Sequence, residues 1–244
     1  MKIGIIGAGN IGSTLAQKLA AHGHTIKLAN SRGPETLAEL AARIGATAVE
    51  RQEAVRDVDA IILATPFDKH VELAPLLSGV GEAVIVIDTS NYYPFRDGDI
   101  EALNQGTAES VYASEMLQRP VVKAWNAVLA KTLQEKGAAA GSVTRIAIPV
   151  AGNDAAAKSV VMELVSQTGF DAVDGGTLEE SWRQQPGTPA YCTELASDAL
   201  SAALNAADKA RAPLNRDALI NAFMSVGDSL THDAIVERNR SVTA

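Results

Sequence analysis

Three glycines near the start of the chain have a spacing that could hold a phosphate group. Gly7, Gly9 and Gly12 form a GxGxxG pattern within the stretch GIIGAGNIGSTL. When this pattern follows a strand and opens a helix, the first glycine allows a tight turn, the second lets a pyrophosphate approach the backbone, and the third lets the helix pack on the strand. Unpaired N–H groups at the helix start would face the diphosphate. We expect a dinucleotide site here, with an ordinary glycine-rich turn as the alternative.

About twenty residues further on, the residue types bear on which dinucleotide binds. An NAD-selective site usually has Asp or Glu at the end of the second strand, whereas this chain has Asn30, Ser31 and Arg32. A hydroxyl and a guanidinium can donate to the 2′-phosphate of NADP(H), which a carboxylate would repel. Because a charged hydrogen bond contributes about 1.5 to 3 kcal/mol, we expect NADPH to be preferred over NADH by roughly tenfold to a few hundredfold. A solvated loop arginine is the alternative interpretation of Arg32.

The elements that must position these residues follow a repeated pattern of strand and helix. Apolar runs predict strands, and the longer periodic stretches predict helices at about 12–22, from Pro34 to Gly45, and at 154–169. The pattern predicts an α/β fold of the Rossmann type, with a doubly wound, mostly parallel sheet covered on both faces. Residues 1–176 would form this NADP-binding domain, and 177–244 a small helical C-terminal region. The expected strands are 2–6, 25–30, 60–66, 83–91, 121–125, 143–152 and 171–176.

Residues at the carboxyl ends of these strands are further candidates, because ligands of open parallel sheets lie at that edge. Thr65 and Pro66 are expected to wall the cofactor, and Asn91 to lie near its nicotinamide half. Ala124, Trp125 and Asn126 close the strand at 121–125. Each of these residues has an alternative role as a turn or cap residue.

Composition excludes several classes of function. Twenty-one Lys and Arg against 29 Asp and Glu give a net charge of −8, which argues against nucleic acid as a partner. No apolar run approaches the roughly 18 residues of a membrane span. The single cysteine excludes an internal disulfide framework, and four histidines show no metal-ligand spacing. We expect a cytoplasmic protein that acts on small molecules, with His22 and His24 at a helix terminus and Cys192 as a packing residue.

The blocks GAGNIG, NSRGPETL, VVKAWN, and PVAGNDAAAKSVVMELV followed by DGGTLEES resemble the F420-dependent NADP oxidoreductase family over nearly the whole chain. Relatives pass a hydride between NADPH and a deazaflavin, and related modules serve as reductase domains of membrane metalloreductases. The resemblance implies NADP(H) as cofactor, and coenzyme F420 or a flavin such as FMN or FAD as acceptor. It also implies that Ala8, Gly9, Asn10 and Ile11 contact the diphosphate, and that Ser31 and Arg32 contact the 2′-phosphate. The chain departs from archaeal relatives at 124–126, where they tend to carry a histidine, and at 181–192.

Hydride transfer between two flat rings needs positioning and the exclusion of water rather than acid or base chemistry. We expect Asn91 and residues 124–126 to orient nicotinamide and acceptor, and the region from Trp182 to Tyr191 to cover the acceptor. A homodimer is expected to bury part of the apolar surface of residues 190–226. Two other functions stay open. One is reduction of a small imine or carbonyl, with Lys123, Tyr191 or Tyr112 as proton donor; the other is an NADPH-binding sensor without turnover.

Overall fold

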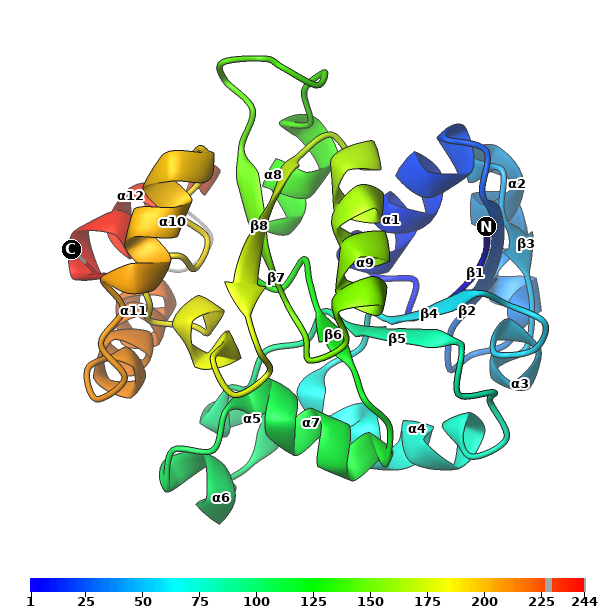
Figure 1. Cartoon of the computed structure of the whole chain (residues 1–244), viewed down its shortest axis with the longest axis horizontal. Helices are drawn as coiled ribbons and strands as arrows, with labels where there is room; N and C mark the ends of the chain where they lie inside the picture. Colours follow the sequence, from blue (N-terminus) through cyan, green and yellow to red (C-terminus); the bar gives the residue numbers. More distant parts are fainter. Residues whose placement is uncertain (227–229, 244) are drawn as a thin grey trace.

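A computed structural model of the chain, which describes residues 1–226 and 230–243, contains one eight-stranded sheet (Figure 1). The strand order is β3-β2-β1-β4-β5-β6-β7-β8, in which β3-β2-β1-β4-β5-β6 is the Rossmann arrangement. Neighbouring strands are parallel except β6 and β7, which pair antiparallel through Lys123 and Ala151. The strands are β1 Lys2–Ile6, β2 Thr25–Ala29, β3 Thr47–Ala48, β4 Ala60–Leu63, β5 Ile85–Asp88, β6 Val122–Lys123, β7 Ala147–Ala151 and β8 Asp171–Gly176.

Helices cover both faces of this sheet, which confirms the doubly wound prediction (Figure 1). The strands are apolar on both sides, so that Ile3 and Ile62 belong to one buried cluster while Ile6 and Ile61 belong to the other. One face carries α1 Asn10–Ala21, α2 Ala38–Ile44, α8 Ala130–Glu135 and α9 Ala155–Gln167; the opposite face carries α3 Arg51–Ala54, α4 His70–Leu77 and α7 Glu109–Leu117.

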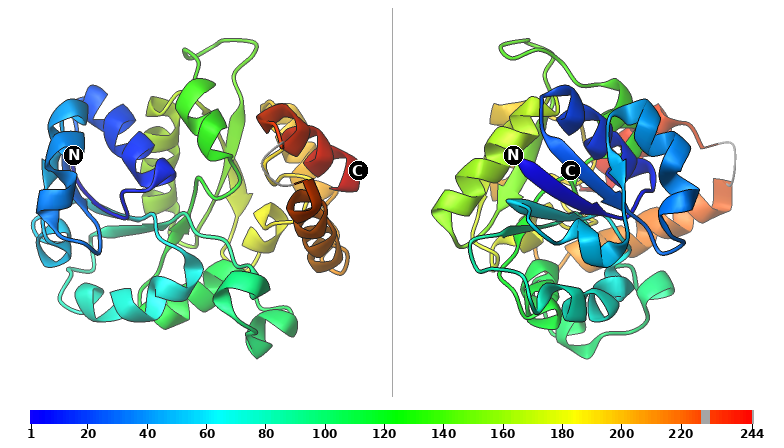
Figure 2. Two further views of the ribbon diagram at one scale, coloured as in Figure 1. Left: turned by 180° about the vertical axis from the view of Figure 1, so that it is seen from behind. Right: turned by 90° about the vertical axis from the view of Figure 1, so that its right-hand side faces the viewer.

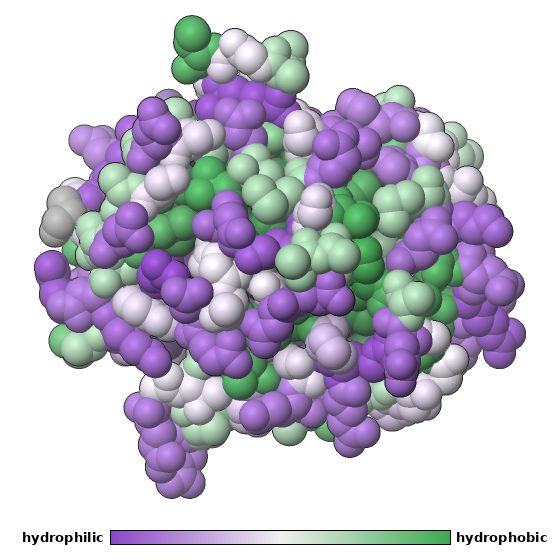
Figure 3. Space-filling view, viewed as in Figure 1, coloured by the Kyte–Doolittle hydropathy of each residue, from purple (hydrophilic) through white to green (hydrophobic). Residues whose placement is uncertain are grey.

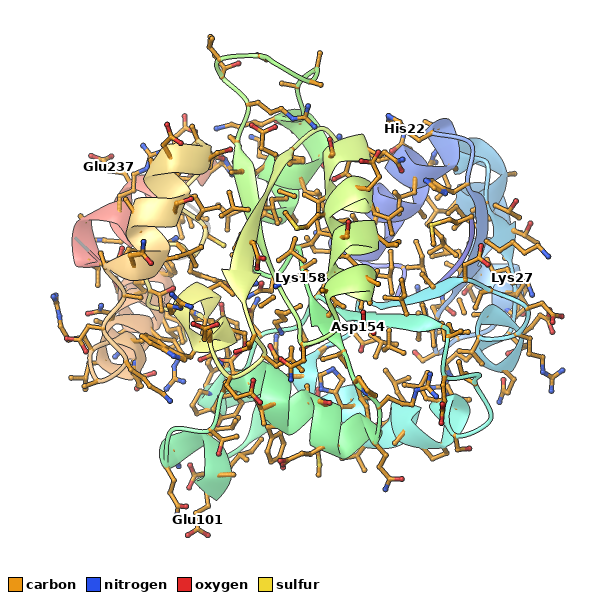
Figure 4. All side chains as sticks on the ribbon, viewed as in Figure 1. His22, Lys27, Glu101, Asp154, Lys158 and Glu237 are labelled. Atoms are coloured by element: carbon orange, nitrogen blue, oxygen red, sulfur yellow. The ribbon has the colours of Figure 1, made fainter. Side chains whose placement is uncertain are left out.

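The ends of these helices follow from local chemistry. His22 is the C-cap of α1, and its ring Nδ1 lies 2.9 Å from the carbonyl oxygen of Lys18, as expected for a residue at a helix terminus (Figure 4). The stretch after Pro34 begins as a short 3-10 turn, η1 Pro34–Leu37, before α2 follows and ends at Gly45 with φ 75°. Asp154 caps α9 by accepting a hydrogen bond from the N–H of Ala157 (Figure 4).

Five of the seven expected strands are shorter than predicted; those expected at 60–66 and 83–91, for example, are limited to Ala60–Leu63 and Ile85–Asp88. The strand expected at 121–125 is limited to Val122–Lys123, because Trp125 has a φ of 56° that turns the chain away from the sheet. The strand expected at 143–152 begins only at Ala147, because the N–H of Arg145 closes a turn onto Ser142. The segments between β4 and α7 hold short helices that no periodicity revealed: η2 Phe67–Lys69, α5 Pro94–Asp97 and α6 Glu101–Asn104.

After β8 ends at Gly176, the regular elements among the described residues are all helices: η3 Ser181–Gln184, α10 Ser197–Asn205, α11 Ala212–Val226 and α12 His232–Thr243. Leu200 and Leu204 of α10 pack on Ala147 of β7, at the end of the sheet opposite to β3. From behind, α11 and α12 lie at one end of the molecule and the first β/α units at the other (Figure 2).

Hydrophobic and hydrophilic residues are distributed unevenly over one face of the molecule. Hydrophobic residues are visible mainly beside the helices in the middle of that face, and hydrophilic residues predominate around its edge (Figure 3). None of the described helices has both the length and the apolar composition that a membrane-spanning segment needs.

Candidate functional site

The loop after β1 has the backbone geometry of a phosphate cradle. Gly7 has a φ of +108°, and its N–H donates to the carbonyl oxygen of Ala29 at 2.8 Å. A Cβ on Gly12 would clash with the carbonyl oxygen of Gly7, so only glycine lets α1 approach β1 this closely. A Cβ on Gly9, in contrast, would meet nothing within 4 Å. Gly9 is also the N-cap of α1 and has no side chain to satisfy the first N–H groups. The loop therefore has both the space and the donors that a diphosphate requires.

The loop after β2 is held by the side chain of Asn30. Its Oδ1 accepts from the N–H of Arg32 at 2.9 Å, and its Nδ2 donates to Thr36 Oγ1 at 2.9 Å. Ser31 and Arg32 are exposed, and Arg32 forms no ion pair with the described residues. Asn30 thus builds the turn, while the hydroxyl of Ser31 and the guanidinium of Arg32 stay accessible beside the strand end.

Thr65 and Pro66 follow β4 directly and lie against the phosphate loop. The Thr65 Cγ2 is 3.2 Å from the position that a Cβ of Gly7 would occupy, so the two loops are in contact. The Thr65 hydroxyl is buried and has no hydrogen-bond partner among the described residues, whereas Pro66 is exposed. The role of these two residues as a wall for the cofactor stays a prediction.

Residues from three distant segments meet beyond the carboxyl ends of β5 and β6. The Nδ2 of Asn91 donates to the carbonyl oxygen of Asn126 at 2.9 Å, and the Nδ2 of Asn126 donates to Asn91 Oδ1 at 3.0 Å. Gln184 completes the group, because its Nε2 donates to Asn126 Oδ1 at 2.8 Å and its carbonyl oxygen accepts from Asn126 Nδ2 at 2.9 Å. The structure thus brings together two strand-end residues and the segment expected to cover the acceptor.

Two tyrosine hydroxyls extend this group of amides. The Nδ2 of Asn91 donates to the Tyr191 hydroxyl at 3.3 Å, and the hydroxyls of Tyr191 and Tyr93 are 2.7 Å apart. Burial raises the pKa of Tyr191 well above its ordinary value, and it also raises the pKa of Tyr93. Both hydroxyls are therefore neutral at physiological pH. We call Asn91, Asn126, Gln184, Tyr93 and Tyr191 the strand-end network.

Beneath this network lies a buried charged cluster, of which sequence reasoning considered only the lysine. Lys123 and Asp88 are both fully buried, and Lys123 Nζ lies 2.7 Å from Asp88 Oδ2. His70 Nε2 is 3.3 Å from the other oxygen of that carboxylate. Although burial alone would raise it, Lys123 and His70 hold the pKa of Asp88 far below its usual range. Lys123 also donates to the carbonyl oxygen of Ser90, so its donors are directed into the protein.

Glu109, at the start of α7, adds a second buried carboxyl to this region. Burial raises its pKa to about 7, and Lys123 and the N–H of Tyr92, which donates to Glu109 Oε2 at 3.0 Å, oppose that rise only in part. Neither Glu109 nor His70 stands in a recognisable motif, and only their neighbourhood in the fold reveals them.

The remaining candidates lie apart from the strand-end network or in the core. Trp125 and Ala124 are buried in the main cluster, where the indole N–H of Trp125 donates to Thr168 Oγ1 at 3.3 Å. The ring of Tyr112 stacks on Phe67, 6.0 Å between centroids. Burial raises the pKa of the Cys192 thiol to about 12, so this residue is a packing group and no nucleophile at neutral pH.

Comparison with known proteins identifies relatives of the chain. The family described as NADP oxidoreductase, coenzyme F420-dependent, matches residues 2–92. The chain is 41% identical over 102 residues to the protein YjhV of Escherichia coli strain K12, a match that covers 42% of this chain and 74% of YjhV. A hypothetical protein from Sinorhizobium meliloti is 34% identical with a TM-score of 0.70, covering 81% of this chain and 96% of that chain.

The chain belongs to the F420-dependent NADP oxidoreductase family. A solved structure from Arthrobacter sp. FB24 that carries the name of an F420-dependent NADP reductase shares the fold, with a TM-score of 0.60, 22% identity, and coverage of 93% of this chain and 95% of that one. The family supports NADP(H) as the dinucleotide for the loop after β1 and an oxidoreductase activity for the protein.

Proposed function

We propose that this protein transfers a hydride between NADP(H) and the ring of a flavin-like or deazaflavin acceptor. The observation that carries the proposal is the neutral character of the strand-end network. Its amides and hydroxyls bond to one another, and the charged groups beneath it, Lys123 and Asp88, are paired and fully buried. Arg96, a partly exposed charged residue that contacts the network, donates to the carbonyl oxygen of Asn91 and is paired with Asp97. Hydride transfer between rings needs orientation rather than acid or base chemistry, and a wall of amides and hydroxyls can provide that orientation.

The residues of the phosphate loop fit the cofactor. The open space over Gly9 and the free N–H groups at the start of α1 would hold the diphosphate, and Ser31 with Arg32 would bind the 2′-phosphate. When bound, NADPH supplies the hydride: its nicotinamide C–H bond breaks, both electrons and the hydrogen form a new bond on the acceptor ring, and NADP⁺ remains. The acceptor ring, which gains the hydride, would take one proton from solvent to reach its neutral reduced form.

Two observations favour a ring acceptor over an imine or carbonyl substrate. A carbonyl substrate needs a proton donor, yet Lys123 is fully buried and Tyr112 packs on Phe67. Tyr191 is the candidate whose hydroxyl does reach the strand-end network, but burial raises its pKa and it already bonds to Tyr93. None of these three candidate donors is therefore suited to protonate a carbonyl, and Glu109, whose pKa is about 7, bonds to the N–H of Tyr92 rather than to the strand-end network.

Stopped-flow oxidation of NADPH with a panel of acceptors tests the proposal. We expect F420, FMN or FAD to be reduced at a rate that changes little between pH 6 and 8, and small carbonyls and imines to be inert. Oxidation by carbonyls alone, with a rate that falls as pH rises, would replace the proposal with the carbonyl reductase. Tight binding of NADPH without oxidation by any acceptor would favour a sensor.

A further inference from the structure

Two positively charged side chains line a small cavity that lies outside the strand-end network. The cavity has a volume of about 170 Å³ and lies between η3, the loop that joins α6 to α7, and the first turn of α11 (Figure 1). Among the described residues, none of the strand-end network and none of the loop after β1 lines it. The cavity is therefore separate from the dinucleotide site. Its polar and aromatic lining includes Tyr92, Glu109, Trp182, Gln185, Lys209 and Arg216.

The two cations lie over aromatic rings of the cavity and keep donors for a further partner. Lys209 Nζ is 5.8 Å from the centroid of the Trp182 ring, and no carboxylate among the described residues pairs with it. The guanidinium carbon of Arg216 is 5.7 Å from the centroid of the Tyr92 ring, and its Nε donates to Asp217 at 2.8 Å. Because the Arg216 side chain is only 12% exposed, its two Nη groups lie at the cavity rather than in open solvent.

A buried amide in the same cavity has no hydrogen-bond partner. The Nε2 of Gln185 is buried, and nothing in the described part of the chain accepts a hydrogen bond from it. Buried donors in folded proteins are nearly always paired, because an unpaired donor has lost its bonds to water without replacing them. An oxygen atom of a ligand in the cavity would accept this bond.

We propose that this cavity binds a compact dianion, such as inorganic phosphate or a short dicarboxylate. Lys209 and Arg216 would balance its charge with charge-assisted hydrogen bonds, and the amide of Gln185 would donate to one of its oxygens. The volume of 170 Å³ is below the roughly 300 to 1,000 Å³ of pockets for larger ligands, which limits the occupant to a small anion. The inference goes beyond the proposed function and does not depend on it, because binding is measured without turnover.

The cavity adjoins the strand-end network through the backbone of one segment. Gln185 directly follows Gln184, whose Nε2 donates to Asn126 Oδ1 at 2.8 Å. An anion held by Gln185 would therefore restrain the end of η3 that carries a member of the network. We expect the backbone amides of residues 181–186 to exchange their hydrogens more slowly when the anion is bound.

Glu109 gives the site a predicted pH dependence. The charged groups that face this carboxyl are Lys123 of β6, Asp88 of β5, Arg216 of α11 and, across the cavity, Lys209. Because burial raises the pKa of Glu109 to about 7, its carboxyl is mainly neutral at pH 6 and mainly charged at pH 8, where it repels an anion. The affinity for sulfate, which stays doubly charged over this range, should therefore fall about fivefold from pH 6 to pH 8.

Isothermal calorimetry with sulfate, inorganic phosphate and succinate tests the site. Each anion is titrated into protein with and without saturating NADP⁺, which would occupy the phosphate loop after β1. An anion bound in the cavity should keep the same Kd in both titrations. Whichever of phosphate and succinate binds more tightly identifies the occupant as a free phosphate or as a carboxylate metabolite. Hydrogen exchange then locates the bound anion, with protection expected at 181–186 and not at 7–12.

Three variants and a matched control sharpen the test. Lys209→Gln and Arg216→Gln should each weaken the binding of all three anions about tenfold or more. Because Lys209 is exposed, its substitution tests the site even where Arg216→Gln affects folding. Glu109→Gln should keep the same sulfate affinity at pH 6 and pH 8. Arg211→Gln, on an exposed arginine that does not line the cavity, should bind every anion as wild type does.

The outcomes separate this inference from the proposed function. Loss of anion binding when NADP⁺ is added would place the anion in the phosphate loop and overturn the site. Equal binding by wild type and both cation variants, or no heat from any of the three anions at millimolar concentration, would also overturn it. A sulfate affinity that does not change with pH would contradict the role of Glu109. If NADP⁺ does not bind, the proposed function fails, whereas anion binding that depends on Lys209 and Arg216 would still support this site.

Discussion

The phosphate loop after β1 and the strand-end network after β5 and β6 lie at the same edge of one sheet but are built from different parts of the chain. The loop is made of backbone: Gly7 turns with positive φ, Gly9 leaves open space, and Gly12 lets two backbones touch. The network is made of side chains from three segments, such as Asn91, Asn126 and Gln184, and it lies on a buried ion pair.

This difference determines how each region responds to substitution. A backbone site depends on a few positions where a side chain must be absent, and its neighbours can vary. A buried polar network depends on every member, because a lost partner leaves another group without a hydrogen bond in a medium of low dielectric. We therefore expect substitutions in the network to act first on stability, and substitutions in the loop to separate stability from binding.

The largest effect is expected from Asp88→Ala, which removes the partner of a fully buried lysine. Breaking such a pair costs about 3 to 5 kcal/mol, because Lys123 would lose the carboxylate that compensates its burial in the core. Urea unfolding measures the loss. Asp68→Ala serves as the control, since Asp68 pairs with Lys69 at the surface, where such a pair contributes less than about 1 kcal/mol. Equal losses for the two variants would show that the buried cluster is no more important than a surface pair.

Glu109→Gln sharpens the contrast through pH. Because burial raises the folded-state pKa of Glu109 to about 7, its contribution to stability is fully present below the unfolded pKa of about 4.3 and is lost as pH rises toward 7. Relative to the variant, wild type should lose on the order of 3 kcal/mol of unfolding free energy between about pH 4 and pH 8. Urea unfolding at both pH values measures this difference. If the unfolding free energies of the two proteins changed with pH in parallel, the pKa of Glu109 would not be raised by folding, which would contradict the prediction.

Two alanine substitutions test the loop, with one as the control for the other. Gly12→Ala places a methyl group against the carbonyl oxygen of Gly7 and should cost about 1 to 3 kcal/mol of stability. Gly9→Ala adds its methyl group in open space and should leave the unfolding free energy nearly unchanged, yet raise the Kd for NADPH about tenfold or more, because the methyl group stands where the pyrophosphate approaches. Calorimetry and thermal unfolding measure the two quantities. Unchanged NADPH affinity in Gly9→Ala would contradict the cradle.

The sequence predicts features that depend on local signals, such as the loop, better than features that depend on distant residues, such as the network. The glycine pattern, the buried strands and Pro34 with Gly45 predict the first half of the fold, because their signals are local. Lys123 appears in an apolar run that gives no sign of Asp88 as its partner, 35 residues away. Trp125 continues the apolar pattern of β6, but its left-handed φ ends the strand. The short helices α5 and α6 span four residues each, which is too little for a 3.6-residue period to become visible.

At the site itself, the residues predicted from the strand ends do meet. The hydrogen bonds that join them could not be predicted from the sequence. Asn91, Asn126 and Tyr191 were candidates because each follows a strand or lies in the region expected to cover it. Gln184 joins them by bonding to Asn126 across 58 residues. No local pattern distinguishes such a glutamine from an exposed one. The same holds for His70, the first residue of α4, whose ring contacts Asp88 in the buried charged cluster.

The central claim is that the backbone loop after β1 holds a dinucleotide whose 2′-phosphate is bound by Arg32. Isothermal calorimetry of wild type, Arg32→Ala and the control Arg43→Ala with NADPH and NADH tests it most directly. We predict that wild type binds NADPH at least about tenfold more tightly than NADH, that Arg32→Ala abolishes this preference by weakening NADPH alone, and that Arg43→Ala, exposed near the end of α2, leaves it intact. Equal weakening of both dinucleotides in Arg32→Ala, or no heat of binding from either one with folded wild type, would contradict the account.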